Sequence, residues 1–248
     1  MLNYKLLISY DGTAYSGWQG RINDKSIQAL IETALTTVLR EPITIIGSGR
    51  TDSGVHALAQ VAHFTTTQNF NTKKILHSLN CLLSSDIRIH SLEQTDTSFH
   101  ARYSAQGKIY RYHILECYKY DPFKRHTAYC LPYPIDHALL AQAARYFIGT
   151  KDFTSFSNEP NQGSCSRNPI RTIKRLDIHI EGGEIILEFE GNGFLYKMVR
   201  NIVGTLLDIA RGKIPLENLP KIFEAKDRRQ AGRCAPPQGL FLVKVIYV

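Results

Sequence analysis

The first hundred residues show two spacings of apolar side chains, one typical of strands and one typical of helices. The segment YKLLISY (4–10) has the spacing of a strand. After Ser26, which suits the cap of a helix, apolar side chains recur on one helical stripe, at Ile27, Leu30, Ile31, Ala34, Leu35, Val38 and Leu39. Strands are predicted near 43–48 and 58–66, a helix at about 72–83 and a strand near 86–94. The predicted order is βαββαβ.

The rest of the chain repeats this order of elements without repeating the sequence. It predicts a strand at 108–116, a helix at 136–148 capped by Asp136, strands at 173–180 and 184–190, a helix at 195–211 and a strand at 241–247. We therefore expect an α+β fold of two ferredoxin-like halves, residues 1–105 and 106–248, with mostly antiparallel sheets and helices packed on one face.

The two halves differ in the loop that joins their middle strands. In the second half this loop is EGGE (181–184), a minimal turn, whereas in the first it is expanded to GSGRTDSGVHA (47–57). An expansion that folding does not require favours function. The expanded loop carries one acidic residue, Asp52, two positions after Arg50. By spacing alone this pair also fits a surface ion pair at the tip of a hairpin.

The charge of the chain is unevenly distributed. Its 248 residues are 43% hydrophobic and 21% charged, which is typical of a folded protein, and the formal net charge is +8. Residues 1–105 carry nine Lys and Arg against eight Asp and Glu, whereas residues 106–248 carry 21 against 14. The second half is therefore the expected platform for a polyanionic partner. A solvated basic surface without a partner stays open as the alternative.

Several classes of protein do not fit the sequence. No window approaches the run of about 20 apolar residues that crosses a bilayer, and the first residues do not have the pattern of a signal peptide, so we expect a cytoplasmic protein. The five cysteines are scattered and contain no C-x-x-C pair, which fits neither a disulfide framework nor a zinc knuckle. We expect most of them to be small buried side chains.

Five stretches of the sequence carry a family resemblance: YDGTAYSGWQ (10–19), GSGRTDSGVHALAQVAHF (47–64), FHARYSAQGKIYRY (99–112), GNGFLYKMVRNIVG (191–204) and APPQGLFLVKVIY (235–247). In this order, and nearly from end to end, the chain resembles the bacterial TruA family of tRNA pseudouridine synthases, which act on the anticodon stem-loop. One small departure is Ser53, where many members have alanine.

The resemblance implies a pseudouridine synthase fold, a homodimer, and action on uridines at tRNA positions 38 to 40. It also implies roles for four residues of this chain. Asp52 would be the catalytic aspartate and nucleophile, with Arg50 as its neighbour. Tyr110 would be the aromatic residue in the uridine site, and Arg200 a basic residue near the aspartate.

A single carboxylate suits this chemistry. The conversion of uridine to pseudouridine moves C1′ from N1 to C5 of the same uracil, so we expect neither a redox cofactor nor a metal. A carboxylate can attack as a nucleophile or balance positive charge at C1′, as in glycosidases. Glycosidases use a second acid because they activate water, whereas here the detached base returns. Arg50 could orient Asp52 or fill the space of a base flipped out of the stack.

The residues of the second half are ambiguous by pattern alone. Arg200 lies opposite the apolar stripe of its helix, together with Gly204 and Asp208, so periodicity predicts a solvated residue and only the resemblance gives it a role. Tyr110 and Tyr112 project from one face of their strand, which fits core aromatics as well as a stacking platform or a base for the C5 proton.

Other residues were weighed for catalysis or RNA contact. We leave His56 and His63 out of the catalytic set. The segment DRRQAGR (227–233), Lys73 and Lys74 are candidates for phosphate contacts, with solvated charge as an equal alternative.

Two other classes of protein remain as rivals. A pair of RNA-recognition motifs has the same element order, but its third strand needs a Lys/Arg-Gly-aromatic signature that LAQVAHFTT lacks. A carboxylate-dependent hydrolase would need a second acid, and none lies near Asp52 in sequence. An acid close in space remains open.

Overall fold

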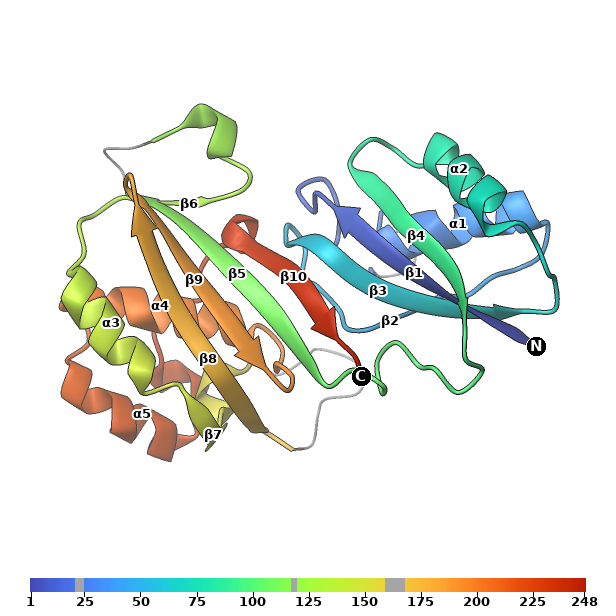
Figure 1. The fold of residues 1–248 in the computed structure, drawn as a ribbon. Coiled ribbons are helices and arrows are strands. Elements are labelled where there is room, and N and C mark those ends of the chain that lie inside the picture. Colours follow the sequence, from blue (N-terminus) through green and yellow to red (C-terminus); the bar gives the residue numbers. More distant parts are fainter. Residues whose placement is uncertain (21–24, 117–119, 159–167) are drawn as a thin grey trace. The chain divides into compact units, whose positions relative to one another are not determined.

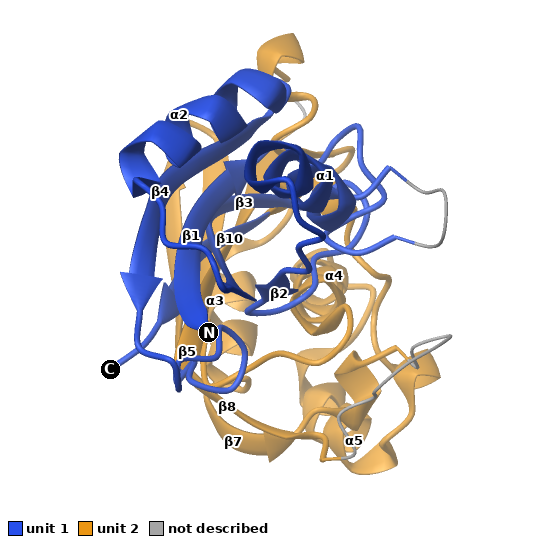
Figure 2. Ribbon diagram, turned by 90° about the vertical axis from the view of Figure 1, so that its right-hand side faces the viewer, with its two compact units in different colours: residues 1–106, 241–248 blue, residues 107–240 orange. Residues whose placement is uncertain are grey.

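The computed structural model describes residues 1–20, 25–116, 120–158 and 168–248. They form two compact units, one of residues 1–106 with 241–248 and one of residues 107–240 (Figure 2). Each unit is an α+β structure with a mostly antiparallel sheet, which confirms the predicted fold class.

The first unit contains the predicted βαββαβ order (Figure 1). Its elements are β1 (Leu2–Tyr10), α1 (Ile27–Leu39), β2 (Ile46–Gly47), β3 (His56–Thr66), α2 (Thr72–Leu82) and β4 (Ile87–Thr95). In the sheet, β1 lies between β4 and β3 and is antiparallel to both, and β2 pairs with β3. The two helices pack beside each other.

Strand β2 is much shorter than the predicted strand at 43–48. The reason lies in α1, whose side chains accept hydrogen bonds from the backbone that precedes β2. The Ile43 N–H donates to Thr36 Oγ1 (3.2 Å) and the Ile45 N–H donates to Glu32 Oε1 (2.9 Å). These donors are therefore satisfied without a partner strand.

Helix α1 begins where the sequence predicts. The Ser26 side chain accepts from the Ala29 N–H (3.4 Å), and the helix ends at Arg40, whose φ of 56° is left-handed. The predicted stripe faces inward, with Ile27, Ile31, Ala34, Leu35 and Leu39 buried.

The second unit contains the strands and helices from β5 to α5 (Figure 1). They are β5 (Gly107–Glu116), β6 (Tyr129–Leu131), α3 (His137–Arg145), β7 (Gly149–Asp152), β8 (Ile170–Glu181), β9 (Glu184–Gly191), α4 (Met198–Ala210) and α5 (Leu219–Ala225). The order in the sheet is β5-β9-β8-β7, with β6 parallel to β5. Asp136 caps α3, as predicted, by accepting from the Leu139 N–H (2.9 Å). Strands β6 and β7 and helix α5 are additions to the predicted elements.

The closing strand β10 (Leu240–Ile246) accounts for the main difference between the compact units and the expected division at residue 105; the other is Gln106, which belongs to the first unit. Residues 241–248 group with the first unit. There Phe241 and Leu242 pair in parallel with His56 and Ala57 of β3. The expected division placed these residues with the second half.

Helix α4 is buried on almost every side, which contradicts its predicted polar face. Gly204 and Asp208 are buried because the backbone around Arg233 packs over them: a Cβ on Gly204 would lie 1.5 Å from the Arg233 carbonyl oxygen. The Arg233 N–H donates to Asp208 Oδ2 (3.2 Å), and the Gly232 N–H donates to Thr205 Oγ1 (2.9 Å). The polar side chains of this face thus hold the covering segment.

Three strands of the second unit are joined by an ion-pair ladder. Glu188 of β9 pairs with Arg111 Nε of β5 (2.5 Å) and with an Arg175 guanidinium nitrogen of β8 (2.6 Å). Burial opposes ionisation of Glu188, but the hydrogen bonds from the two arginines outweigh burial and hold the pKa of this carboxyl below its usual range.

Among the described residues, no helix is long and apolar enough to span a membrane. Of the described cysteines, Cys81 is exposed and Cys130 and Cys234 are partly exposed, so the expectation of buried side chains is wrong for them. Cys117 and Cys165 lie outside the described residues.

Candidate active site

Asp52 lies in the loop between β2 and β3, at a tight turn of the first unit. The Val55 N–H donates to the Asp52 carbonyl (3.1 Å), and Gly54 has a φ of 77°, which a residue with a side chain rarely adopts. Asp52 is half-buried, whereas Arg50 and Ser53 are exposed. The turn therefore fixes the backbone at Asp52 and leaves this residue half-buried.

The end of β1 and the segment that follows it hold this loop by three hydrogen bonds. The Trp18 N–H donates to the Thr51 carbonyl (3.1 Å), and Ser53 Oγ donates to the Tyr15 carbonyl (3.0 Å). The hydroxyls of Tyr10 and Thr51 share a buried hydrogen bond of 2.8 Å. The stretch YDGTAYSGWQ, which entered the sequence analysis only through the family resemblance, thus anchors the residues on both sides of Asp52.

Two glycines allow this close contact between backbones. Gly17 has a φ of 92°, and a Cβ there would lie 2.4 Å from the Thr51 carbonyl oxygen and 2.9 Å from the Asp52 carbonyl carbon. A Cβ on Gly12 would lie 2.0 Å from the Val55 carbonyl oxygen. A side chain at either position would push the Asp52 loop away.

A buried glutamine holds the other end of the loop. Gln60 of β3 is fully buried; its Oε1 accepts from Ser48 Oγ (2.7 Å) and its Nε2 donates to the Gly49 carbonyl (2.9 Å). Nearby, a Cβ on Gly47 would lie 2.6 Å from the indole ring of Trp18, which is itself buried. A polar side chain in the otherwise apolar run of β3 was the available sequence signal for this contact.

The two histidines left out of the catalytic set make structural contacts. His56 is buried, accepts from the Gly12 N–H through Nδ1 (3.1 Å), and stacks on Phe241 with ring centres 4.5 Å apart. His63 Nδ1 accepts from the Ala101 N–H (3.1 Å), and burial lowers the pKa of His63.

Tyr110 belongs to the second unit and lies on β5. It is 8% exposed, and its ring meets Phe194 edge-to-face with centres 5.1 Å apart. Tyr112 projects from the same face, as predicted, but it is a core residue: it is fully buried and its hydroxyl donates to the Pro236 carbonyl (2.7 Å). The two tyrosines are therefore distinguished by their surroundings and not by their spacing.

Arg200 lies in the first turn of α4 and is half-buried. Its Nε donates to the Ala235 carbonyl (2.8 Å), and the Ala235 N–H donates to the Arg200 carbonyl (3.0 Å). The solvated position that periodicity predicts is therefore wrong, because the segment that covers α4 also holds this side chain. The positive charge of Arg200 also acts on the Tyr112 hydroxyl.

The four predicted site residues fall in two groups. Arg50 and Asp52 share one loop of the first unit, and Tyr110 and Arg200 lie in the second unit. Over the part of the chain that the structure describes, no three His, Cys, Asp or Glu side chains are placed to hold a metal ion.

The candidate phosphate contacts also separate into two kinds. Arg228 is a structural residue: a guanidinium nitrogen donates to Asn201 Oδ1 (2.9 Å), and burial lowers the pKa of Arg228. Arg229 is exposed and pairs with Asp227 (2.8 Å), and Lys73 and Lys74 are exposed in the first turn of α2. Of these four side chains, Arg228 is half-buried and the other three are exposed.

Comparison with known proteins gives a consistent result. A family model described as tRNA pseudouridine synthase matches residues 6–104 and 143–248. The tRNA pseudouridine synthase A 1 of Protochlamydia amoebophila (strain UWE25) is 51% identical over 98% of this chain and 96% of the relative. The tRNA pseudouridine synthase A of Exiguobacterium sp. (strain ATCC BAA-1283 / AT1b) is 44% identical over 100% of this chain and 98% of its own length. That of Acetivibrio thermocellus is 43% identical over 100% of both chains. A solved Cbf5-Nop10-Gar1 complex matches 82% of this chain and 54% of that chain at 11% identity with a TM-score of 0.37, which is too remote to bear on the activity.

Proposed function

The chain belongs to the tRNA pseudouridine synthase family, and from this premise we propose that it converts uridine to pseudouridine in the anticodon stem-loop of tRNA, with Asp52 as the catalytic nucleophile. The observation that carries the proposal is the anchoring of the Asp52 loop. Hydrogen bonds from Tyr10, Trp18 and Gln60 hold the loop on both sides, while Asp52 is half-buried between exposed neighbours at Arg50 and Ser53. A fixed carboxylate at an accessible turn is what a nucleophile requires.

The reaction is an isomerisation, and its atoms balance within one nucleoside. The N1–C1′ bond breaks, the uracil turns, and C5 bonds to C1′. C5 then loses its proton and N1 takes one up. Asp52 would attack either C1′ or the uracil ring and so hold the intermediate until the base returns.

Arg50 would act next to Asp52 during base flipping. It is exposed and lies two residues before the carboxylate on the same loop. A uridine in a stem must leave the stack before its glycosidic bond can be reached. The guanidinium can occupy the place of the flipped base and contact a neighbouring phosphate.

Tyr110 and Arg200 would contribute from the second unit. We propose that the Tyr110 ring stacks on the uracil and that its hydroxyl takes the C5 proton. Its slight exposure and its edge-to-face contact with Phe194 suit a ring that is held in place at a surface. Arg200, held by the Ala235 carbonyl, would supply positive charge to the bound nucleotide.

The substrate is a polyanion, which fits the basic surplus of residues 106–248. The proposal includes uridines at positions 38 to 40, a homodimer and a cytoplasmic location. These three points rest on the family resemblance alone. Sedimentation of the protein with and without tRNA tests the dimer.

The experiment that tests the function uses tRNA labelled with tritium at uridine C5. We expect the protein to release tritium to water and to leave pseudouridine in the RNA, because isomerisation must remove the C5 proton. Release of free uracil would identify a hydrolase. Retention of tRNA without tritium release would identify an RNA-binding module. Either result would refute the proposed function.

A further inference from the structure

An excursion of the chain between β5 and β6 exposes large aromatic side chains. Its described part, residues 120–128, includes a short helix at Pro122–Lys124. Phe123 is 89% exposed and Tyr120 is 59% exposed. The βαββαβ order does not require an excursion here. Large apolar side chains on a loop that the fold does not need indicate a contact surface.

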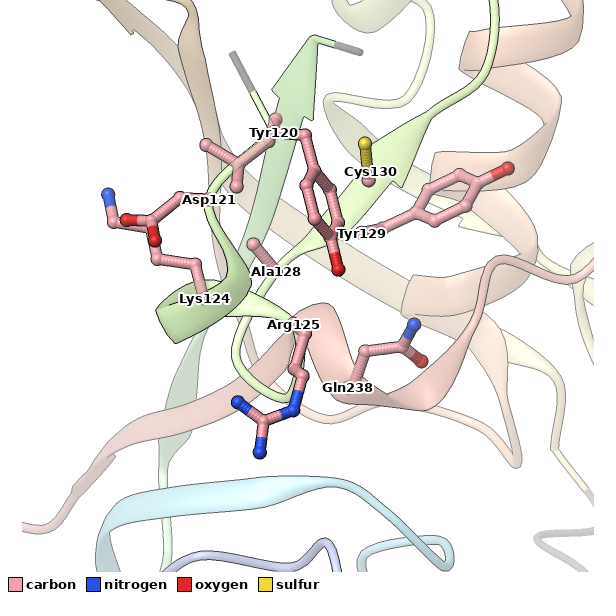
Figure 3. A pocket seen from close by; sticks show the side chains of 9 residues that line it. Tyr120, Asp121, Lys124, Arg125, Ala128, Tyr129, Cys130 and Gln238 are labelled. Atoms are coloured by element: carbon pink, nitrogen blue, oxygen red, sulfur yellow. The ribbon is translucent and has the colours of Figure 1, made fainter.

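The excursion also borders a pocket in the second unit. The pocket has a volume of about 260 Å³. Figure 3 shows Tyr120, Arg125 and Gln238 around it, whereas the ring of Tyr129 of β6 points away from them. Aromatic faces, a guanidinium and an amide are the groups that recognise a nucleobase that is not in a duplex. The size of the pocket suits one flat base.

One guanidinium at the pocket, that of Arg125, is available to a ligand. Asp121 is engaged within the excursion, where its carboxylate accepts from the Phe123 N–H (2.9 Å), and Lys124 pairs with Glu184 (2.5 Å). Within the described part of the chain, Arg125 donates one guanidinium N–H to the Pro122 carbonyl (2.9 Å). A guanidinium has five N–H donors, so most of the hydrogen-bonding capacity of Arg125 remains for a ligand.

The pocket is separate from Tyr110 along the same strand. The excursion leaves β5 after Glu116, six residues beyond Tyr110. The pocket lining lies slightly nearer, at Leu115 and at Tyr129 opposite Ile114, and four to five residues of strand span about 13–17 Å. A nucleotide in the pocket is therefore a different nucleotide from one stacked on Tyr110.

We infer that residues Tyr120, Phe123, Arg125 and Gln238, here called the 120s surface, bind a second, unpaired nucleotide of the tRNA. Its base stacks on the exposed aromatic rings and Arg125 contacts its phosphate or base edge. This inference rests on the proposed function for its choice of RNA. A second binding point for the substrate would raise affinity without taking part in the chemical step.

The test compares a double variant with a matched control. Tyr120→Ala/Arg125→Ala removes one ring and one guanidinium from the 120s surface. Arg145→Ala/Tyr146→Ala removes the same groups from the exposed end of α3, in the same unit. Dissociation constants for whole tRNA are measured by filter retention, with steady-state kinetics and a melting curve for each protein.

We expect the 120s variant to raise the Kd and KM for tRNA on the order of ten-fold, because the base loses its stacking on one aromatic ring, and to leave kcat unchanged. The control should bind like the parent. Tyr120→Phe, which keeps the ring, should also bind like the parent, and this variant separates loss of stacking from local misfolding.

A crosslink identifies the contact directly. Benzoylphenylalanine in place of Phe123 should crosslink on irradiation to a tRNA nucleotide other than the reacting uridine. A Kd within twofold of the parent, an equal loss in the control, or a crosslink to a second copy of the chain would overturn the inference. Direct binding does not depend on catalysis, so a parent that binds tRNA through this surface but releases no tritium would refute only the proposed function.

Discussion

Replacement of Thr51 by valine tests whether the buried hydrogen bond beside Asp52 positions the catalytic loop. Valine keeps the shape of threonine but removes the hydroxyl that shares a 2.8 Å hydrogen bond with Tyr10. Tyr10 is 4% exposed, so its hydroxyl cannot turn to water. Leaving a buried hydroxyl without its partner costs about 1–3 kcal/mol. Because the Gln60 side chain also reaches the Tyr10 hydroxyl, we expect the lower part of this range, about 1–2 kcal/mol.

A double-mutant cycle separates this hydrogen bond from other effects of the substitution. Tyr10→Phe removes the second partner, so the double variant Tyr10→Phe/Thr51→Val has no orphaned hydroxyl at this place. Urea unfolding of the four proteins should therefore show a coupling energy of about 1 kcal/mol, with the double variant less destabilised than the sum of the single variants. Effects that add within about 0.3 kcal/mol would refute the reasoning.

The variants of Thr51 also test whether its hydrogen bond to Tyr10 positions Asp52 for catalysis. Thr51 precedes Asp52 directly, and a displacement of about 1 Å at a reacting group can cost on the order of 100-fold in rate. We expect Thr51→Val to lower kcat at least about ten-fold with little change in the Kd for tRNA, and Thr51→Ser to restore it, since serine keeps the hydroxyl. A normal kcat in Thr51→Val would show that this hydrogen bond serves stability alone.

Four further outcomes follow from the structure. Gly204→Ala should cost several kcal/mol of unfolding free energy or abolish folding, because its Cβ would lie 1.5 Å from a backbone oxygen. The control is Gly193→Ala, whose Cβ would have ordinary contacts at 3.6 Å. Similar melting curves for the two variants would contradict the packing of α4. Tyr110→Phe should bind tRNA normally and lose most turnover; parental turnover would make Tyr110 a platform only. The lowered pKa of Glu188 means that its carboxylate stabilises the fold above the unfolded pKa and that this stability is lost as the pH falls through the lower folded pKa. Urea midpoints between about pH 7 and pH 3 should therefore fall less in Glu188→Gln than in the parent, and parallel curves would argue against the ladder. Binding of tRNA should weaken steeply with salt, and a flat dependence would contradict the basic platform.

Local patterns predicted most of the fold because their causes are local. The stripe of α1 and the caps at Ser26 and Asp136 depend on neighbours within a few residues, and the structure confirms all three. The face of α4 that contains Gly204 and Asp208 was misjudged because the segment that covers it lies more than twenty residues further along the chain. An amphipathic pattern reports which side chains are polar, and here those polar side chains bind protein instead of water.

In the candidate site, too, contacts between residues far apart in the sequence could not be predicted from local patterns. Asp52 is visible in the sequence because its loop is longer than the equivalent turn of the other half. The contacts that hold it are not visible, since the Tyr10–Thr51 hydrogen bond joins residues 41 positions apart. No spacing rule connects Gly17 to the Asp52 backbone either, because the need for a glycine there appears only once the chain has folded, when a Cβ at Gly17 would lie 2.4 Å from the Thr51 carbonyl oxygen.

The most direct test of the account is the rate of pseudouridine formation by Asp52→Asn in a single turnover on an anticodon stem-loop. Asparagine keeps the shape of the side chain but cannot act as an anionic nucleophile. We expect a melting curve and a Kd for RNA like those of the parent, and a rate lower by about 10⁴-fold or more, as for the loss of other catalytic nucleophiles. A rate within about ten-fold of the parent would contradict the role of Asp52, and a collapsed melting curve would assign it to the structure of the loop.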